Sequence, residues 1–267
     1  MNPIILAVLI LGVTALIAGL GLSIAAKVFA VPVDEKAEEI GELLPGANCG
    51  ACGFSGCAGY ASALSTGKTT DTALCAPGGN EVSKKIAECM GLKAGTVLPS
   101  AAVVLCQGTL SKASVKMKYV GVDSCRMASQ LFGGPKDCVY GCLGLGDCLR
   151  ACPYNAIKIC DGVARVDPLA CRACKQCVST CPKHLIEMMP LHTTKAAVLC
   201  KNTDKGAVVR KECQKGCIGC MRCQKACEYS AVTVSNNVAY VDNEKCVGCG
   251  KCAEVCPVKC IDLITLD

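Results

Sequence analysis

The residues best suited to chemistry in this 267-residue sequence are its 27 cysteines, many of which are separated by only two or three other residues. Residues 171–182 and 246–257 each follow the pattern Cys-x2-Cys-x2-Cys-x3-Cys-Pro, and residues 217–228 share it except that Glu228 replaces the proline. Three close thiolates in this pattern bind one [4Fe–4S] cluster, while the fourth cysteine reaches a neighbouring cluster. Structural zinc normally uses two separated Cys-x2-Cys pairs, so this spacing favours the iron–sulfur cluster.

These runs belong to an internal repeat with an offset of 75 residues. The stretches 153–170 and 228–245 are both 18 residues long and join cysteines of corresponding runs. In each stretch two short apolar segments flank a pair of residues that tolerate positive φ, Asp161-Gly162 in the first and Asn236-Asn237 in the second. This pattern predicts a β-hairpin in each repeat, with strands at 156–159 and 163–166 and at 231–234 and 238–241.

Within each repeat the fourth cysteine is expected to cross to the other cluster. The run 138–148 has looser spacing than the others, so an enlarged loop is expected at 143–147, where Gly144 and Gly146 permit tight turns. The predicted ligand sets are Cys138, Cys142, Cys148 and Cys181 for cluster 2; Cys171, Cys174, Cys177 and Cys152 for cluster 3; Cys217, Cys220, Cys223 and Cys256 for cluster 4; and Cys246, Cys249, Cys252 and Cys227 for cluster 5.

A separate cysteine group at 49–75 has the spacing Cys-x2-Cys-x4-Cys-x17-Cys. Gly50, Gly53 and Gly56 lie between its early members, where they let the backbone turn and bring N–H groups toward the sulfurs. Small and apolar residues over 55–65 predict a helix packed against the site. The predicted ligands of cluster 1 are Cys49, Cys52, Cys57 and Cys75.

Seven cysteines remain outside these five sets. Two of them end the apolar stretches 102–106 and 196–200, and two others each precede a cysteine run. Because two strand ends and two loops can meet, we predict a sixth [4Fe–4S] cluster, with four buried free thiols as the alternative. Its predicted ligands are Cys106, Cys125, Cys200 and Cys213, and the remaining Cys89, Cys160 and Cys260 are interpreted as buried small hydrophobic residues.

The segment 4–26 contains no charged residue over 23 positions. Its length matches a helix that crosses a bilayer, and no basic residue precedes it as in a cleaved signal peptide. Lys27 and Lys36 follow it, so the positive-inside rule predicts an outer N-terminus and a cytoplasmic remainder. The many thiols agree, because the cytoplasm keeps them reduced. We therefore expect a single-pass protein of the cell (inner) membrane.

The expected fold class is a series of small α+β iron–sulfur domains: a transmembrane helix, one helical [4Fe–4S] domain and two bacterial-type 2[4Fe–4S] ferredoxin modules. Metal binding is expected to supply much of the folding free energy, because the sequence has no Trp and only 3 Phe. The predicted boundaries are 1–29 for the anchor, 30–43 for a linker, 44–91 for the helical domain, 92–135 for a β-rich connection, 136–190 for module 1, 191–212 for a second connection and 213–267 for module 2.

Other function classes lack their signatures. The formal charge of +6 counts cysteines as neutral thiols, and no basic run interleaved with aromatics suggests a nucleic-acid partner. No G-x-G-x-x-G follows a strand, which argues against a nicotinamide site. Only 2 histidines are present, so no Ser/His/Asp hydrolase set is expected.

With these features in this order, the chain resembles the iron–sulfur B subunit of the Rnf complexes over essentially its whole length. The most specific residues of the resemblance are 49–53 (CGACG), 75–79 (CAPGG) and 140–144 (YGCLG). The resemblance implies a component of an ion-transporting ferredoxin:NAD⁺ oxidoreductase, a translocase in which this chain performs electron transfer only. It implies electron donation by soluble ferredoxin and transfer toward integral membrane subunits of a Na⁺ or H⁺ pump. The C-terminal modules are then the expected ferredoxin dock and the Cys49 cluster the exit.

Two other interpretations remain open from the residues. An electron-transfer subunit of a membrane hydrogenase or a molybdenum-type reductase would share the ferredoxin modules, although such subunits need no separate cluster domain beside the membrane. A zinc-stabilised interaction scaffold is the third interpretation, and metal analysis separates it from the other two.

Overall fold

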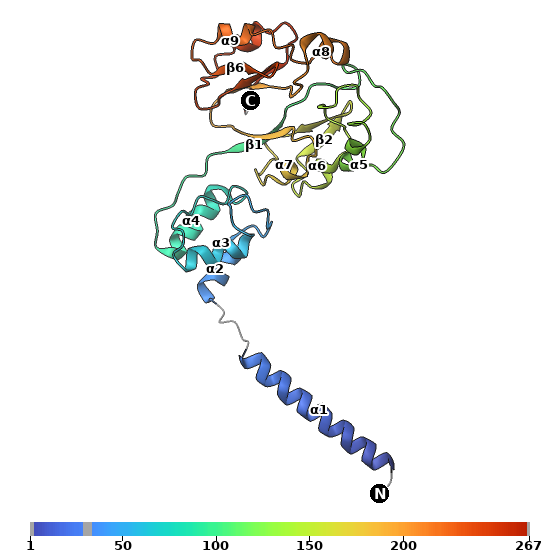
Figure 1. Cartoon of the computed structure of the whole chain (residues 1–267). Helices are drawn as coiled ribbons and strands as arrows, with labels where there is room; N and C mark the ends of the chain where they lie inside the picture. Colours follow the sequence, from blue (N-terminus) through green and yellow to red (C-terminus); the bar gives the residue numbers. More distant parts are fainter. Residues whose placement is uncertain (1–2, 29–33, 266–267) are drawn as a thin grey trace.

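The computed structural model describes residues 3–28 and 34–265 (Figure 1). Residues 1–2 and 29 of the predicted anchor, 30–33 of the predicted linker and 266–267 of module 2 lie outside this description. The first element is α1 (Pro3–Val28). An 18-residue window with a mean hydropathy of 2.7 lies within its 24-residue segment Ile4–Lys27. At 1.5 Å per residue that is about 36 Å of helix, which is long and apolar enough to cross a membrane.

Three helices form the N-terminal domain: α2 (Glu35–Leu43), α3 (Cys57–Ser65) and α4 (Gly79–Met90). The Asp34 carboxylate caps α2 by accepting hydrogen bonds from the N–H groups of Lys36 and Ala37. Ile40 of α2 is fully buried in the core of this domain, together with Leu64 of α3. Residues 35–43 therefore belong to this domain, and the prediction of a linker over 30–43 is wrong for them. The helix predicted at 55–65 is confirmed as α3.

Each repeat contains the predicted β-hairpin, shifted by one residue in its first strand. The first pairs β2 (Ile157–Cys160) with β3 (Val163–Val166), and the second pairs β6 (Val232–Ser235) with β7 (Val238–Val241), both antiparallel. All four turn residues have positive φ, between 45° at Asp161 and 72° at Gly162. The turn chemistry read from the sequence therefore fixes the hairpins.

Each repeat also has a second two-stranded sheet built from its two ends. The strand β1 (Ser100–Val104) pairs with β4 (Ile186–Pro190), and β5 (Lys195–Val198) pairs with β8 (Ile261–Ile264). The two predicted connections thus contribute strands to the modules. The first is not rich in strands, because its described residues contain only β1 and the short helix α5 (Cys125–Gln130) as regular elements.

Short helices complete the two modules. Two of them follow or overlap the cysteine runs of module 1, two do so in module 2, and one precedes the runs of module 2 (Figure 1). They are α6 (Asp147–Arg150), α7 (Gln176–Thr180), α9 (Arg222–Ala226), α10 (Lys251–Glu254) and α8 (Gly206–Glu212).

The cores of the two modules consist mainly of cysteines, alanines and β-branched residues. Val163 and the corresponding Val238 are fully buried, and each packs in a core that includes several cysteines of its own module. The two modules therefore bury many of their cysteines in cores that the hairpins and short helices complete.

Candidate iron–sulfur sites

The four predicted ligands of cluster 1 lie together in the N-terminal domain. Burial raises the pKa of Cys75, and the nearby Cys57, Cys49 and Cys52 add to that rise. The N–H of Cys57 donates to the Asn48 side-chain oxygen at 2.9 Å, which fixes the start of α3 beside the cysteine loop. A side chain at Gly56 would lie 2.8 Å from the same oxygen, so this close approach requires glycine.

The predicted ligands of cluster 3 also converge. Burial raises the pKa of Cys177 to about 11, and its neighbours contribute further. The neighbours are Cys171, Cys174 and Cys152, and all four cysteines line one cavity between β1, β3 and the cysteine loop.

In module 2 the predicted sets are close in the same way. Burial raises the pKa of Cys223 to about 11, with contributions from Cys217, Cys220 and Cys256 of the cluster 4 set. In the cluster 5 set, burial raises the pKa of Cys252, and Cys246 and Cys249 add to it. Cys227 packs against the core that contains Cys246 and Cys252, and its sulfur accepts a hydrogen bond from the Ala231 N–H at 3.3 Å.

The remaining two predicted sets differ from the structure by an exchange of two cysteines. One cavity in module 1 is lined by Cys142, Cys148 and Cys181, as predicted for cluster 2, but the fourth cysteine there is Cys125. Burial raises the pKa of Cys148 to about 12, and Cys142, Cys125 and Cys181 contribute next. The predicted fourth member, Cys138, lines a different cavity.

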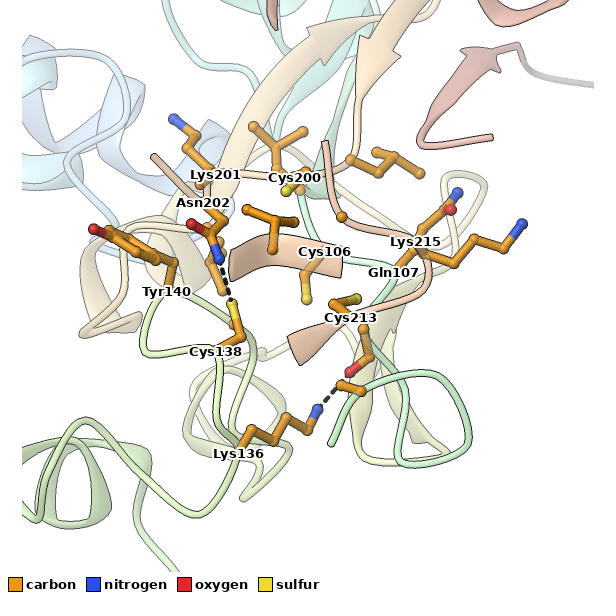
Figure 2. Close-up of a pocket in the computed structure, with 18 residues that line it drawn as sticks. Cys106, Gln107, Lys136, Cys138, Tyr140, Cys200, Lys201, Asn202, Cys213 and Lys215 are labelled. Atoms are coloured by element: carbon orange, nitrogen blue, oxygen red, sulfur yellow. Dashed lines mark hydrogen bonds between the residues drawn. The ribbon is translucent and has the colours of Figure 1, made fainter. Parts of the chain in front are cut away.

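That second cavity lies between the two modules and is shown in Figure 2. Cys106 follows β1 and Cys200 follows β5, and these two residues reach the cavity with Cys138 and Cys213. Asn202, which is almost completely buried, donates a hydrogen bond to the Cys138 sulfur at 3.4 Å. The cavity therefore holds three of the four cysteines predicted for cluster 6, with Cys138 in place of Cys125.

Hydrogen bonds explain why Cys125 and Cys138 exchange places between the cluster 2 and cluster 6 sets. The carboxylate of Asp147 accepts from the Ser124 hydroxyl and the Arg126 N–H, the residues on either side of Cys125. This contact places Cys125 beside Cys148, at the start of α6. Lys136 pairs with Val115 in an isolated β-bridge, which directs the following chain toward the cavity between the modules. Sequence spacing alone carries no signal for either contact, because the partners are far apart in the chain.

Consecutive sets lie near one another along module 1. Burial raises the pKa of Cys174 in the cluster 3 set, and the nearby Cys49 of the cluster 1 set adds to that rise. The pKa of Cys148, raised mainly by burial, also responds to Cys177 of the cluster 3 set. The N–H of Cys142 donates to the sulfur of Cys106 in the next cavity at 3.4 Å.

The contacts continue into module 2. Burial raises the pKa of Cys200 to about 12, and a hydrogen bond from the backbone of Cys217, in the cluster 4 set, opposes that rise. Six of the eight cysteines of the cluster 4 and cluster 5 sets lie in or against one core, while Cys220 and Cys249 are exposed. The six groups of cysteines therefore form a continuous row that starts at the N-terminal domain, crosses module 1 and the cavity between the modules, and ends in module 2.

The three other cysteines have different environments. Cys260 is buried, as predicted, and its sulfur lies 3.7 Å from that of Cys256. Cys89 is only half-buried against the N-terminal core. Cys160 is exposed, so its interpretation as a buried residue is wrong; it stands at the end of β2, next to the hairpin turn. The histidines add no ligand to these groups, because both His184 and His192 are exposed.

The chemistry of these groups fits [4Fe–4S] clusters. All 27 cysteines are free, and sets of four line shared spaces in apolar surroundings. Burial makes their thiolates costly, and iron offsets that cost because a coordinating thiol is deprotonated by the metal charge. A bound [4Fe–4S] cluster would supply reversible one-electron chemistry to such a site. Among the described residues, no three His, Cys, Asp or Glu side chains are close enough to hold a single metal ion.

Comparisons with known proteins agree with the cysteine pattern. Family models described as a 4Fe-4S dicluster domain, a 4Fe-4S binding domain and a putative Fe-S cluster match residues 207–263, 168–189 and 44–77. The chain is 44% identical to the B subunit of the Na(+)-translocating ferredoxin:NAD(+) oxidoreductase complex of Acetobacterium woodii, over 98% of this chain and 78% of that protein. The chain belongs to the family of Rnf B subunits.

A second member of the Rnf B family shows that the similarity extends over both repeats. The B subunit of the ion-translocating oxidoreductase complex of Methanosarcina acetivorans is 37% identical over 93% of this chain and 96% of its own length. Family membership and the cluster models support iron–sulfur electron transfer within a multi-subunit, ion-translocating ferredoxin:NAD⁺ oxidoreductase. They favour this interpretation over a component of a hydrogenase or a molybdenum-type reductase, and α1 is consistent with membrane anchoring.

Proposed function

We propose that this chain is the electron-transfer component that accepts electrons from reduced ferredoxin and passes them to membrane partners of a Na⁺ or H⁺ pump that reduces NAD⁺. The relatives named above support the donor and the acceptor, since the name of the Acetobacterium woodii protein specifies a ferredoxin:NAD⁺ oxidoreductase. The chain itself performs electron transfer only, and its partners carry the NAD⁺ chemistry and the ion path.

We further propose six [4Fe–4S] clusters. Four ligand sets are those predicted from the sequence, for clusters 1, 3, 4 and 5. The other two follow the cavities of the structure and are revised accordingly. They are Cys125, Cys142, Cys148 and Cys181 for cluster 2, and Cys106, Cys138, Cys200 and Cys213 for cluster 6.

The observation that carries the proposal is the continuous row of cysteine groups. A protein that only stored iron or used it for stability would not need ligand sets from different domains close to one another. Here Cys49 neighbours Cys174 across the domain boundary, and Cys200 neighbours Cys217 across the module boundary. The cluster 6 set connects the two modules, so it completes the path from one end to the other.

The two ends of the row of cysteine groups differ in a way that supports a direction of electron transfer. In module 2, Cys220 and Cys249 are exposed. The exposed Arg222 lies near Cys220, and the exposed Lys251, which is ion-paired with Glu228, lies near Cys249. Exposed ligands with basic neighbours suit docking of an acidic electron donor. The other end is the N-terminal domain, which follows α1 in the chain. We therefore propose entry at module 2 and exit at the cluster 1 set, with the N-terminus outside and the iron–sulfur domains in the cytoplasm.

The test is reduction of the anaerobically purified full chain in detergent by chemically reduced, low-potential ferredoxin. The absorbance of all clusters is expected to bleach, and freeze-quenched EPR is expected to show module 2 signals before that of cluster 1. Failure of ferredoxin to reduce a chain that dithionite reduces would refute the proposal.

A matched pair of variants tests whether electrons pass between the modules through the cluster 6 set. Cys200→Ala removes a ligand between the modules and is expected to leave rapid reduction of module 2 while cluster 1 reduction slows. Cys160→Ala alters an exposed cysteine outside the six sets and is expected to behave as wild type. Equal cluster 1 kinetics in the two variants would contradict the proposed order.

A further inference from the structure

Lys136 is a buried lysine at the junction of two cysteine cavities. Its relative exposure is 1%, and its ammonium donates three hydrogen bonds to backbone carbonyls. The acceptors are Gly108 at 2.7 Å, Cys142 at 2.8 Å and Gly162 at 2.9 Å. Three carbonyl acceptors match the three N–H donors of a lysine ammonium group. Figure 2 shows the side chain reaching toward the cavity that contains Cys106, Cys138 and Cys213.

This charge has no carboxylate partner within ion-pair distance among the described residues. Hydrogen bonds from Ser111 lower the pKa of the Asp161 carboxyl, and the Lys136 charge lowers it further. Asp161 is exposed, however, and forms no ion pair with Lys136. A buried charge is costly unless a compensating charge is near. The source of compensation must therefore be something other than an acidic side chain in ion-pair contact.

Cysteines from both neighbouring sets surround the ammonium. Cys142 belongs to the proposed cluster 2 set and supplies one of the three carbonyls. Cys213 belongs to the proposed cluster 6 set, in whose cavity Lys136 is a lining residue. The lysine thus faces two candidate clusters at once, each of which carries net negative charge with four thiolates.

The second repeat shows that the fold does not require this lysine. In module 1 the loop at Gly144 packs so tightly on the hairpin turn that a side chain there would lie 2.5 Å from the Gly162 carbonyl oxygen. In module 2 the same contact recurs between Gly219 and the Asn237 carbonyl, at 2.8 Å. The residue that corresponds to Lys136 is Lys211, which is exposed. The loop–hairpin packing therefore forms with and without a buried lysine.

We propose that Lys136 is a positioning residue for electron transfer, whose fixed positive charge raises the reduction potentials of clusters 2 and 6 above the values they would otherwise have. The inference rests on the proposed ligand sets. Reduction adds one electron to a cluster and so increases its negative charge, and a nearby cation in a low-dielectric site favours that state. Lys136 would thereby keep the two adjoining clusters matched, which helps electrons cross between modules.

The experiment compares the purified full chain with Lys136→Met and Lys136→Gln, and uses Lys211→Met as the exposed control at the corresponding repeat position. Iron and sulfide are counted first, and each sample is then titrated with dithionite under EPR. We expect wild-type iron content in all three variants. Removal of the Lys136 charge is expected to change the equilibrium constant for reduction of cluster 2 or cluster 6 about tenfold, a downward shift of about 59 mV for a one-electron couple.

The outcomes separate this inference from the proposed function. Unchanged potentials in Lys136→Gln with full iron content would overturn it, and so would loss of iron in both neutral variants, because Lys136 would then act only on folding. Lys136→Gln keeps two donors for the three carbonyls, which favours retention of the fold. A wild-type iron count below six clusters would instead reject a ligand set, and the titration of the remaining adjacent cluster would still test Lys136.

Discussion

The carboxylate of Asp147 accepts a hydrogen bond from the Ser124 hydroxyl at 3.1 Å, and this contact joins α6 to the residue that precedes Cys125. It brings Cys125 beside Cys148 across 22 intervening positions of the sequence. The same carboxylate accepts from the Arg126 N–H at 3.0 Å, so the backbone around Cys125 is held on both sides. The presence of Cys125 in the cluster 2 set depends on the contact between Asp147 and Ser124.

The first prediction concerns the ligand exchange. Cys125→Ala is expected to remove the same EPR signal as Cys148→Ala, and Cys138→Ala the same signal as Cys200→Ala, because each pair lines one cavity. Each single variant should lose about four irons per chain. The measurement is an iron count with EPR of the dithionite-reduced chain. The sequence-based sets require the opposite pairing of signals, so that pattern would contradict the structure-based assignment.

The second prediction concerns Asp147 itself. Asp147→Ala removes a partly buried carboxylate that accepts hydrogen bonds from Ser124 and Arg126, and it is expected to destabilise the holo chain by about 2 kcal/mol. It should also make the cluster 2 iron easier to chelate than that of the other sets. Denaturant unfolding and timed chelation measure these effects. The control is Asp123→Ala at a neighbouring exposed position. The Asp123 backbone carbonyl accepts a hydrogen bond from Arg150, and the substitution keeps that carbonyl. Equal behaviour of the two variants would contradict the anchoring role.

Local sequence patterns predict most of the fold, and the cysteines of four predicted site sets lie near one another in the structure. The hairpin turns follow from Asp161-Gly162 and Asn236-Asn237, because their conformational preference is local. The cluster 3 and cluster 4 sets follow from fixed spacing, since three ligands come from one short loop. The positions of Cys125 and Cys138 cannot be predicted in this way. They are decided by tertiary contacts of Asp147 and Lys136, whose partners lie far from them in the chain.

The burial of Ile40 escapes sequence reasoning for a related reason. The segment before Leu44 is highly charged, with Glu35, Lys36 and Glu38 in its first turn, and this composition favours a linker. A short amphipathic helix with a single fully buried residue presents little hydrophobic signal. The Asp34 cap is the sequence feature that could indicate a helix start.

The third prediction concerns the contact between the N-terminal domain and module 1. The Lys175 ammonium donates to the Ala51 carbonyl at 3.5 Å, close to where Cys49 and Cys174 approach each other. Lys175→Ala is expected to lower the free energy of unfolding by less than about 1 kcal/mol, because the hydrogen bond is long and exposed. It should nevertheless weaken the magnetic coupling between clusters 1 and 3 in EPR of the reduced chain. Lys158→Ala, an exposed lysine on β2, should leave the coupling unchanged. Coupling of wild-type strength in Lys175→Ala would count against this role of the contact.

The fourth prediction concerns iron removal. The cores of both modules are centred on cysteines, and the whole sequence offers no Trp and 3 Phe. The iron-free chain is therefore expected to lose cooperative thermal unfolding of the modules, since cluster binding supplies much of their folding free energy. Circular dichroism before and after anaerobic chelation measures this loss. An iron-free chain that melts cooperatively at the temperature of the holo chain would show that the protein fold is sufficient by itself.

The most direct test of the central claim is a count of iron, acid-labile sulfide and zinc in the full chain, purified anaerobically in detergent. Six ligand sets predict about 24 iron and about 24 sulfide per polypeptide, and a value near 20 of each would keep electron transfer but remove one of the six sets. Stoichiometric zinc with little iron would contradict the account, and the chain would then be a zinc-stabilised scaffold.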